Sequence, residues 1–338
     1  MAIVWADGFE VHGTSTYVAR KYAIATNAPG ALTPGRLTGS FGDFNGTILV
    51  TPSFGVENEW CVGIGIQAAG VISPTPFSIR LFTGATEQLR LEMVTSGSGF
   101  AWALKRGATV LATTGTAHAF NVWHYFELKV TVRTGANGSY EIRHNEITLT
   151  SAAGVNTANA GSDGADVLGY GYSTSGSALR IDDLYIDQGV GADFHGDSYL
   201  KGLLPNADGD NLDWTPSTGT DHYVLVDDPA SASNDADYVS SAIMGDVDTY
   251  QYQDLSVNND QVIAVLVWTA ARMAAAGSRQ IRAVYEEPGN SLFPGDTVVV
   301  ASTSVAEFLQ VWEDNPDTGL PWEITEINDG RFGIESVN

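Results

Sequence analysis

The sequence has a single cysteine among its 338 residues, Cys61. One thiol cannot form an intrachain disulfide, and it excludes a zinc site made of cysteines alone. Its neighbours, in EWCVGIGI, are typical of a strand interior. We therefore expect Cys61 to be a small, buried hydrophobic residue.

Basic residues are also scarce: 16 Lys and Arg stand against 40 Asp and Glu, a formal net charge of −24. Such a charge repels nucleic acid and anionic membranes at long range, so neither is an expected partner. Long apolar runs are missing as well, because the longest one (262–271) is far shorter than the roughly 20 residues that span a bilayer. The start, MAIVWADGFE, lacks the basic region of a signal peptide, which predicts synthesis in the cytosol.

Motifs of the common hydrolases do not occur. There is no G-x-S-x-G, no H-E-x-x-H among the six histidines, and no E-x-D-x-x-E of the kind found in laminarinase-type sandwich enzymes. The sequence therefore predicts that the protein is not an enzyme. A glycosidase needs two carboxylates across a cleft, and sequence spacing alone cannot exclude that arrangement.

What the sequence does contain is alternation of apolar and polar residues. In WHYFELKVTVRT (123–134), Phe126, Leu128 and Val130 share one phase, while Trp123 shares the other phase with Tyr125 and Glu127. This pattern is typical of an antiparallel strand with one buried and one solvated face. A hairpin follows, with its bend at 144–146.

In SALRIDDLYIDQ the alternation changes phase at Asp182 and Asp183, which predicts a β-bulge. Glycine-rich residues after Gln188 mark a domain boundary. We therefore expect an all-β chain of two β-sandwich domains in series, residues 1–189 and 198–338, joined by a linker at 190–197. More than ten short strands in the first domain favour a jelly roll.

Other segments are assigned from local pattern. Residues 14–23 predict a short helix, 261–268 a central strand covered on both faces, and 321–327 a strand. Residues 304–312 fit either a helix with a capping box or a strand, and we favour the strand.

Two acidic groups are candidate cation sites. The stretch 206–213 fails the EF-hand spacing, which leaves an irregular site or a set of polar turns. The bulge at Asp182 and Asp183 would place two carboxylates together, with Asp7 beside them if the first and last strands of the domain pair. These three residues are the predicted metal ligands, with Ca²⁺ as the ion, and the alternative is that their carboxylates sit on a solvated edge; no other cofactor is expected.

Aromatic residues suggest a second kind of site. Aromatic rings stack on sugars, and we select the four aromatic residues Trp102, Trp123, Tyr170 and Tyr172 as candidate carbohydrate-binding residues. The alternative for each is a place in the sandwich core. Trp123 has the least core-like position, because it shares the phase of the polar face.

Several stretches resemble known proteins. WADGFEVHGTSTYVARKYA, WHYFELKVTV with EIRHNEITL, and ALRIDDLYIDQG resemble the concanavalin-like (laminin-G-like) jelly rolls of tailed-bacteriophage virion proteins. LLPNADGDNLDWTPSTGTDHYVLVDD, YVSSAIMGDVDTYQYQDL, SRQIRAVY and DNPDTGLPWEITEINDGRFGIE resemble a C-terminal β-sandwich module of such phage structural proteins.

The resemblance implies a virion structural protein at a tail tip, baseplate or fibre. It would be a homo-oligomer that contacts other virion proteins and attaches to a host-surface glycan. The alternatives are a capsid decoration protein of the same fold, and a sandwich glycoside hydrolase or lyase acting on host polysaccharide.

Overall fold

The structure is a computed structural model of the chain. It describes residues 3–9, 18, 20–26, 29–32, 35–37, 41–71, 75–159, 161–172, 179–228, 234–256 and 261–338. The chain divides into two compact units, Met1–Leu200 and Lys201–Asn338. Both are built almost entirely of antiparallel strands, which confirms the predicted all-β class. Among the described residues, no helix has the length and apolar character needed to cross a membrane.

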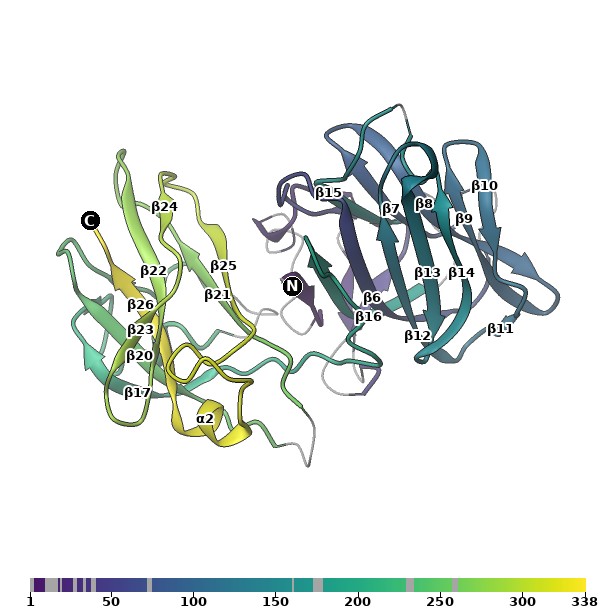
Figure 1. The fold of residues 1–338 in the computed structure, drawn as a ribbon. Coiled ribbons are helices and arrows are strands. Elements are labelled where there is room, and N and C mark those ends of the chain that lie inside the picture. Colours follow the sequence, from purple (N-terminus) through teal and green to yellow (C-terminus); the bar gives the residue numbers. More distant parts are fainter. Residues whose placement is uncertain are drawn as a thin grey trace. The chain divides into compact units, whose positions relative to one another are not determined.

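The first unit consists of two antiparallel sheets that face each other (Figure 1). Sheet A has the order β14 (Ile147–Val155), β13 (Gly138–His144), β12 (Trp123–Thr131), β6 (Glu59–Ala68), β16 (Leu179–Gln188), β4 (Phe41–Phe44) and β3 (Gly30–Leu32), and β1 (Ile3–Asp7) also pairs with β16. Sheet B has the order β10 (Thr109–Thr113), β9 (Gly99–Arg106), β8 (Thr86–Ser96), β7 (Ser78–Thr83), β15 (Val167–Gly171), β5 (Ile48–Val50) and β2 (Ile24–Thr26), and β11 (His118–Ala119) also pairs with β9. A short 3₁₀ turn, η1 (Gly135–Asn137), joins β12 to β13.

The predicted alternation in β12 decides which residues form the core. Phe126, Leu128 and Val130 are buried, and the ring of Phe126 packs 5.2 Å from the ring of Trp102 on β9 of the facing sheet. Since side chains alternate along a strand, Trp123, Tyr125 and Glu127 lie on the outer face of sheet A.

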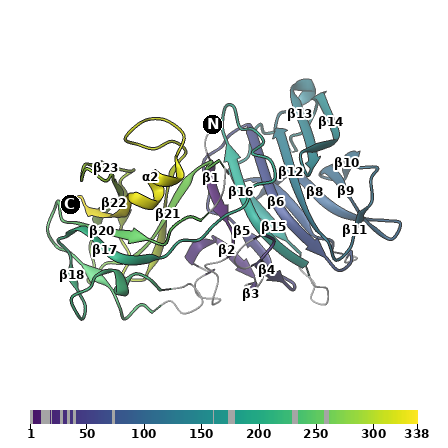
Figure 2. The ribbon, with the colours of Figure 1, turned by 90° about the horizontal axis from the view of Figure 1, so that it is seen from below.

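Two local predictions in this unit are confirmed. Asn145 and Glu146, both with positive φ, form the two-residue turn between β13 and β14. The register of β16 against β6 shifts between Asp182 and Tyr185, and Asp183 has φ 52°, as expected of a bulge. β1 pairs with β16, the last strand of this unit, so its first and last strands do lie side by side (Figure 2).

The second unit has one larger sheet and two ribbons. The sheet has the order β17 (Pro205–Leu212), β20 (Val247–Tyr252), β26 (Arg331–Ser336), β22 (Arg279–Glu286) and β23 (Leu292–Pro294), and β24 (Val298–Val300) also pairs with β22. The ribbons are β18 (Thr215–Pro216) with β19 (Val239–Ser240), and β21 (Val265–Ala271) with β25 (Ala306–Trp312). A 3₁₀ turn, η2 (Tyr223–Leu225), and a helix, α2 (Ile324–Asp329), complete it. Its core includes Tyr285, Trp312, Trp322 and Phe332.

Residues 304–312 contain a strand, β25, as favoured from sequence, but two other predictions are wrong. The strand expected at 321–327 is replaced by α2, because Glu323 and Glu326 form a reciprocal capping box that starts a helix. β21 is not a covered central strand: it pairs with β25 in a two-stranded ribbon, and its residues are half-buried or exposed. Most of the helix predicted at 14–23 lies outside the described residues.

Candidate functional site

Two glycines in the middle of β6 shape the outer face of sheet A. A Cβ atom on Gly63 would lie 2.0 Å from the Tyr185 ring, and one on Gly65 would lie 2.8 Å from Arg36 Cδ. The missing side chains therefore let Tyr185 and Arg36 lie directly against the backbone of the sheet. This explains the glycine alternation of VGIGI, which a strand otherwise disfavours.

A buried carboxylate, Glu127, lies on the strand next to these glycines, opposite Gly63. Its Oε1 accepts hydrogen bonds from the Tyr185 hydroxyl (2.6 Å) and from the backbone amides of His195 (3.1 Å) and Gly196 (2.9 Å). Burial raises the pKa of Tyr185, so this phenol stays protonated and donates. His195 Nε2 lies 3.0 Å from Asp187 Oδ2. The predicted linker residues 193–196 are thus held against the first unit.

The bulge carboxylates lie on the same face, next to Arg36. The Arg36 backbone amide donates to Asp182 Oδ2 (2.6 Å), and its Nε donates to Asp183 Oδ2 (2.9 Å). The guanidinium also bonds to Asp197 and lies 4.7 Å from the Tyr125 ring centroid. Burial raises the pKa of Asp183, and the Arg36 charge opposes that rise.

Asp7 does not join the bulge carboxylates, which corrects the predicted Ca²⁺ site at Asp7, Asp182 and Asp183. The Asp7 side chain accepts a hydrogen bond from the Tyr22 hydroxyl (2.5 Å) and pairs with Lys21 Nζ (3.2 Å). That tyrosine also bonds to Tyr170 of sheet B, so Asp7 faces the interior of the sandwich. Among the described residues, these three carboxylates do not come close enough together to hold one metal ion.

The acidic stretch 206–213 lies in β17 and the residue after it, and its carboxylates have protein partners. Asp208 accepts hydrogen bonds from the backbone amides of His222 (3.2 Å) and Tyr223 (2.7 Å). Asp210 pairs with Arg331 at 3.1 Å, and Asp213 accepts from the Val247 amide at 3.1 Å. These carboxylates therefore hold loops of the second unit through hydrogen bonds and an ion pair. This agrees with the alternative that the stretch is a set of polar turns.

One of the four predicted sugar-binding aromatics remains available. Trp102 and Tyr172 are fully buried and Tyr170 is 1% exposed, so their rings fill the core and cannot stack on a sugar. The prediction for these three residues is wrong, because their side chains point into the sandwich core. Trp123 is half-buried on the outer face, at the start of β12.

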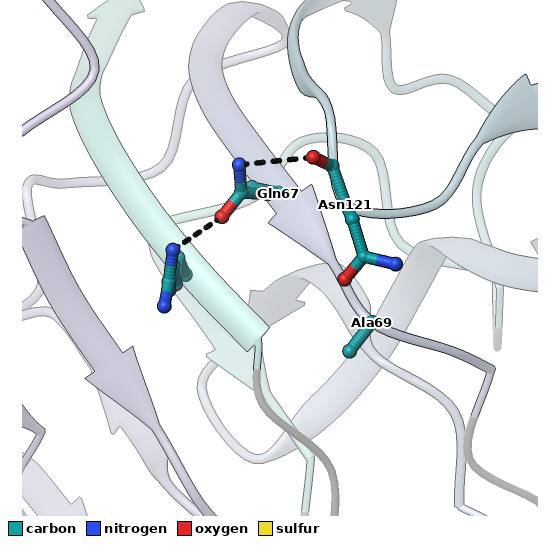
Figure 3. Close-up of a pocket in the computed structure, with 4 residues that line it drawn as sticks. Gln67, Ala69 and Asn121 are labelled. Carbon is teal, nitrogen blue, oxygen red and sulfur yellow. Dashed lines mark hydrogen bonds between the residues drawn. The ribbon is translucent and has the colours of Figure 1, made fainter.

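Around Trp123, three strands place polar groups in one row. Gln67 on β6 is the cross-strand partner of both Trp123 on β12 and Arg180 on β16. Arg180 Nη1 donates to Gln67 Oε1 (2.7 Å), and Gln67 Nε2 donates to the Asn121 carbonyl (3.3 Å), as Figure 3 shows. Gln67, Ala69, Asn121 and Arg180 line a hollow of about 170 Å³.

An apolar partner completes this site, which we call the Trp123 site: Trp123, Gln67, Asn121, Arg180 and Phe41. The Phe41 ring meets Trp123 edge to face at 6.0 Å, and the Arg180 guanidinium lies 4.9 Å from the Phe41 centroid. The sequence analysis missed Gln67, Asn121 and Arg180. The signal for them is the cross-strand register, which only the paired sheet supplies.

No protein-family profile matches the chain, and no curated protein sequence matches it. Among solved structures, the chain is similar to an endo-β-1,4-glucuronan lyase from the fungus Trichoderma reesei (TM-score 0.40, 10% identity, 55% of this chain and 96% of the other). It is similar to the alginate lyase Aly36B (0.38, 10%, 54% and 93%). It is also similar to a carbohydrate esterase from the Shiga toxin-encoding bacteriophage phi24B (0.40, 10%, 56% and 99%).

These matches correct the prediction that the protein is not an enzyme. Two of the proteins named are lyases and the third is an esterase. TM-scores of 0.40 and below do not assign an activity or a substrate to this chain.

Proposed function

We propose that the first unit binds a carbohydrate chain at the Trp123 site. The observation that carries the proposal is a half-buried tryptophan in one row with Gln67 and Arg180, next to an open hollow. An indole presents an apolar ring face to a sugar, and amide and guanidinium groups hydrogen-bond to hydroxyls. The other predicted aromatics have no exposed ring face, whereas this one has polar neighbours suited to a sugar.

The size of the hollow indicates how a glycan would bind. At about 170 Å³ it is smaller than the 300–1,000 Å³ that usually encloses a small ligand. We therefore propose that a chain lies along the outer face of sheet A and places one sugar ring against Trp123. Such a contact is weak for one copy of the protein, and many copies would strengthen it through effective concentration.

A particle that carries many copies of the protein would supply this effective concentration. We propose that the chain is a structural protein of a tailed-phage virion, at a tail tip, baseplate or fibre, where a homo-oligomer presents several glycan sites to the host. The support is the resemblance of the quoted sequence stretches to phage virion proteins. A capsid decoration protein is the alternative location, and immunogold labelling of virions distinguishes tail from head.

The binding proposal is tested by affinity electrophoresis through gels that contain alginate, glucuronan or dextran. We expect retardation by at least one polymer, and loss of that retardation in Trp123→Ala. Tyr238→Ala, which removes a 47% exposed aromatic from the second unit, is the matched control. Equal retardation of Trp123→Ala and the unmodified chain would contradict the proposal.

A second candidate function is cleavage of the bound polysaccharide. The specific observation is Glu127 Oε2, which is buried and has no hydrogen-bond partner among the described residues, beside the Tyr185 hydroxyl bonded to Oε1. A carboxylate and a phenol on one face supply a base and an acid. Residues 195 and 196 cover them, so this activity requires that segment to move. New reducing ends or unsaturated products that vanish in Glu127→Gln would support cleavage.

A further inference from the structure

Three histidines from both sheets of the first unit meet at one end of the sandwich. His118 lies on β11 of sheet B, His124 near the start of β12, and His144 at the end of β13 of sheet A. One ring nitrogen from each residue lies within 4.8 Å of the other two. Because β11 belongs to one sheet and β12 and β13 to the other, the cluster connects the two layers.

The hydrogen bonds fix which nitrogens carry protons. His124 Nε2 lies 2.9 Å from the Ala119 carbonyl oxygen, which only accepts, so this nitrogen donates. In the neutral ring, Nδ1 then has a free lone pair, and it accepts from His144 Nε2 at 3.0 Å. A ring that donates its far N–H to a backbone carbonyl and aims its other nitrogen inward is the usual arrangement of a metal-binding histidine.

His118 has a buried ring nitrogen that also points to a bound ion. This residue is 3% exposed, and its Nε2 is buried without a hydrogen-bond partner among the described residues. A buried polar atom left without a partner costs free energy, and such an atom calls for a physical explanation. A positive ion bound between the three rings would satisfy Nε2 and the neighbouring lone pairs together.

The surroundings favour neutral imidazoles. The rings of Phe100 and Phe126 lie 5.5 and 4.9 Å from the His118 ring. Burial, followed by repulsion from the other two histidines, lowers the pKa of His118 to about 4, and burial lowers that of His144. Neutral imidazole is the form that binds metals. An all-nitrogen set suits Zn²⁺, Cu²⁺ or Ni²⁺, and not Ca²⁺ or Mg²⁺, which prefer oxygen.

We propose that His118, His124 and His144 bind one Zn²⁺-type divalent ion, with water as the fourth ligand, and that the ion ties sheet A to sheet B. In a tetrahedral zinc site with Zn–N bonds of about 2.0–2.1 Å, neighbouring ligand nitrogens are about 3.3 Å apart. The separation of His124 Nδ1 and His144 Nε2 already approaches that value. On binding, the His144 Nε2 proton moves to Nδ1 of the same ring through solvent, so the ring stays neutral.

The test uses the full chain freed of metal by a chelator and then titrated with Zn²⁺ or Co²⁺. We expect one ion per chain, visible bands of tetrahedral Co²⁺, and a rise of about 5–10 °C in the unfolding midpoint of the first unit at 100-fold excess over the dissociation constant. His144→Ala should abolish all three effects, and so should His118→Phe, which keeps an aromatic ring in the pocket.

Ile147→Ala is the matched control, because Ile147 is 70% exposed and pairs with His144 across the turn. It should bind the ion as the unmodified chain does. Circular dichroism of the metal-free variants separates loss of the site from loss of the fold. Binding that survives His144→Ala and His118→Phe would mean that surface carboxylates hold the ion, and would overturn the proposal. So would an absence of bound ion in the folded, unmodified chain.

Discussion

Gln67 lies directly opposite Arg180 in sheet A and accepts a hydrogen bond of 2.7 Å from its Nη1. Gln67 in turn donates to the Asn121 carbonyl, so one amide side chain connects β16 to the loop before β12. The Trp123 site is therefore held together by a residue that lies between its aromatic and its cationic members.

Replacing Gln67 with alanine should weaken glycan binding without unfolding the protein. Loss of one hydrogen bond to the glycan costs about 0.5–1.5 kcal/mol, so we expect a roughly 2- to 13-fold weaker affinity for the polymer that the unmodified chain binds. Titration of that polymer by calorimetry measures the change. Thr148→Ala, an exposed change on the edge strand β14 of the same sheet, should leave affinity as it was. Equal affinity of Gln67→Ala and the control would remove this residue from the site.

Glu127→Ala should release the segment that covers the outer face of sheet A. The change removes the acceptor of the His195 and Gly196 amides and of the Tyr185 hydroxyl, and bonds to a charged group contribute about 1.5–3 kcal/mol. Hydrogen exchange at the amides of residues 195 and 196 should accelerate by at least 10-fold. Asp193→Asn removes an exposed ion pair with Lys129 and should have little effect. Unchanged exchange in Glu127→Ala would show that other contacts hold the segment.

The features that could be predicted from the sequence are those set by residues close together along the chain. The phase of β12, the turn at Asn145 and the bulge at Asp183 follow from alternation and turn chemistry. The strand expected at 321–327 failed because apolar alternation in a short segment competes with a capping box, and the pairing of Glu323 with Glu326 decided for helix.

The sites depend on contacts between distant residues, which no local pattern reports. Trp102 and Tyr170 alternate as any strand aromatic does, and only the pairing of the two sheets turns them inward. The histidine cluster draws on residues 118, 124 and 144, which share no motif spacing. They meet because β11 and β12 start, and β13 ends, at the same end of the sandwich. Asp7 has the right strand neighbour but faces the opposite side of sheet A from Asp182.

Arg36→Met should destabilise the first unit by about 3–5 kcal/mol near neutral pH. The Arg36 side chain is 6% exposed and that of Asp183 4%, so the change leaves a buried carboxylate without its counter-ion. Chemical denaturation with a probe in the first unit measures the loss.

The loss in Arg36→Met should shrink as the pH falls. Burial raises the pKa of Asp183, and removal of Arg36 raises it further, because that charge opposes the rise. With a folded-state pKa above the unfolded one, the folded state binds the extra proton, so stability increases as the pH drops through the folded-state value. The difference between variant and unmodified chain should therefore be smaller at pH 4.5 than at pH 7. A difference that grows with acidity would contradict this assignment of the charge.

Asp248→Ala should loosen the second unit and leave the first unchanged. Asp248 is fully buried, and its two oxygens accept from the Trp214 amide (2.7 Å), His222 Nδ1 (2.7 Å) and the Tyr250 hydroxyl (3.1 Å). Removal leaves three donors without their acceptor, at about 1–3 kcal/mol for each one that stays buried. Hydrogen exchange read separately for β20 and β6 should show faster exchange in β20 alone. Asp237→Asn, a change at a half-buried carboxylate that accepts from the Asn234 side chain in the same unit, serves as the control. Faster exchange in both strands would show that the two units unfold together and would contradict the prediction.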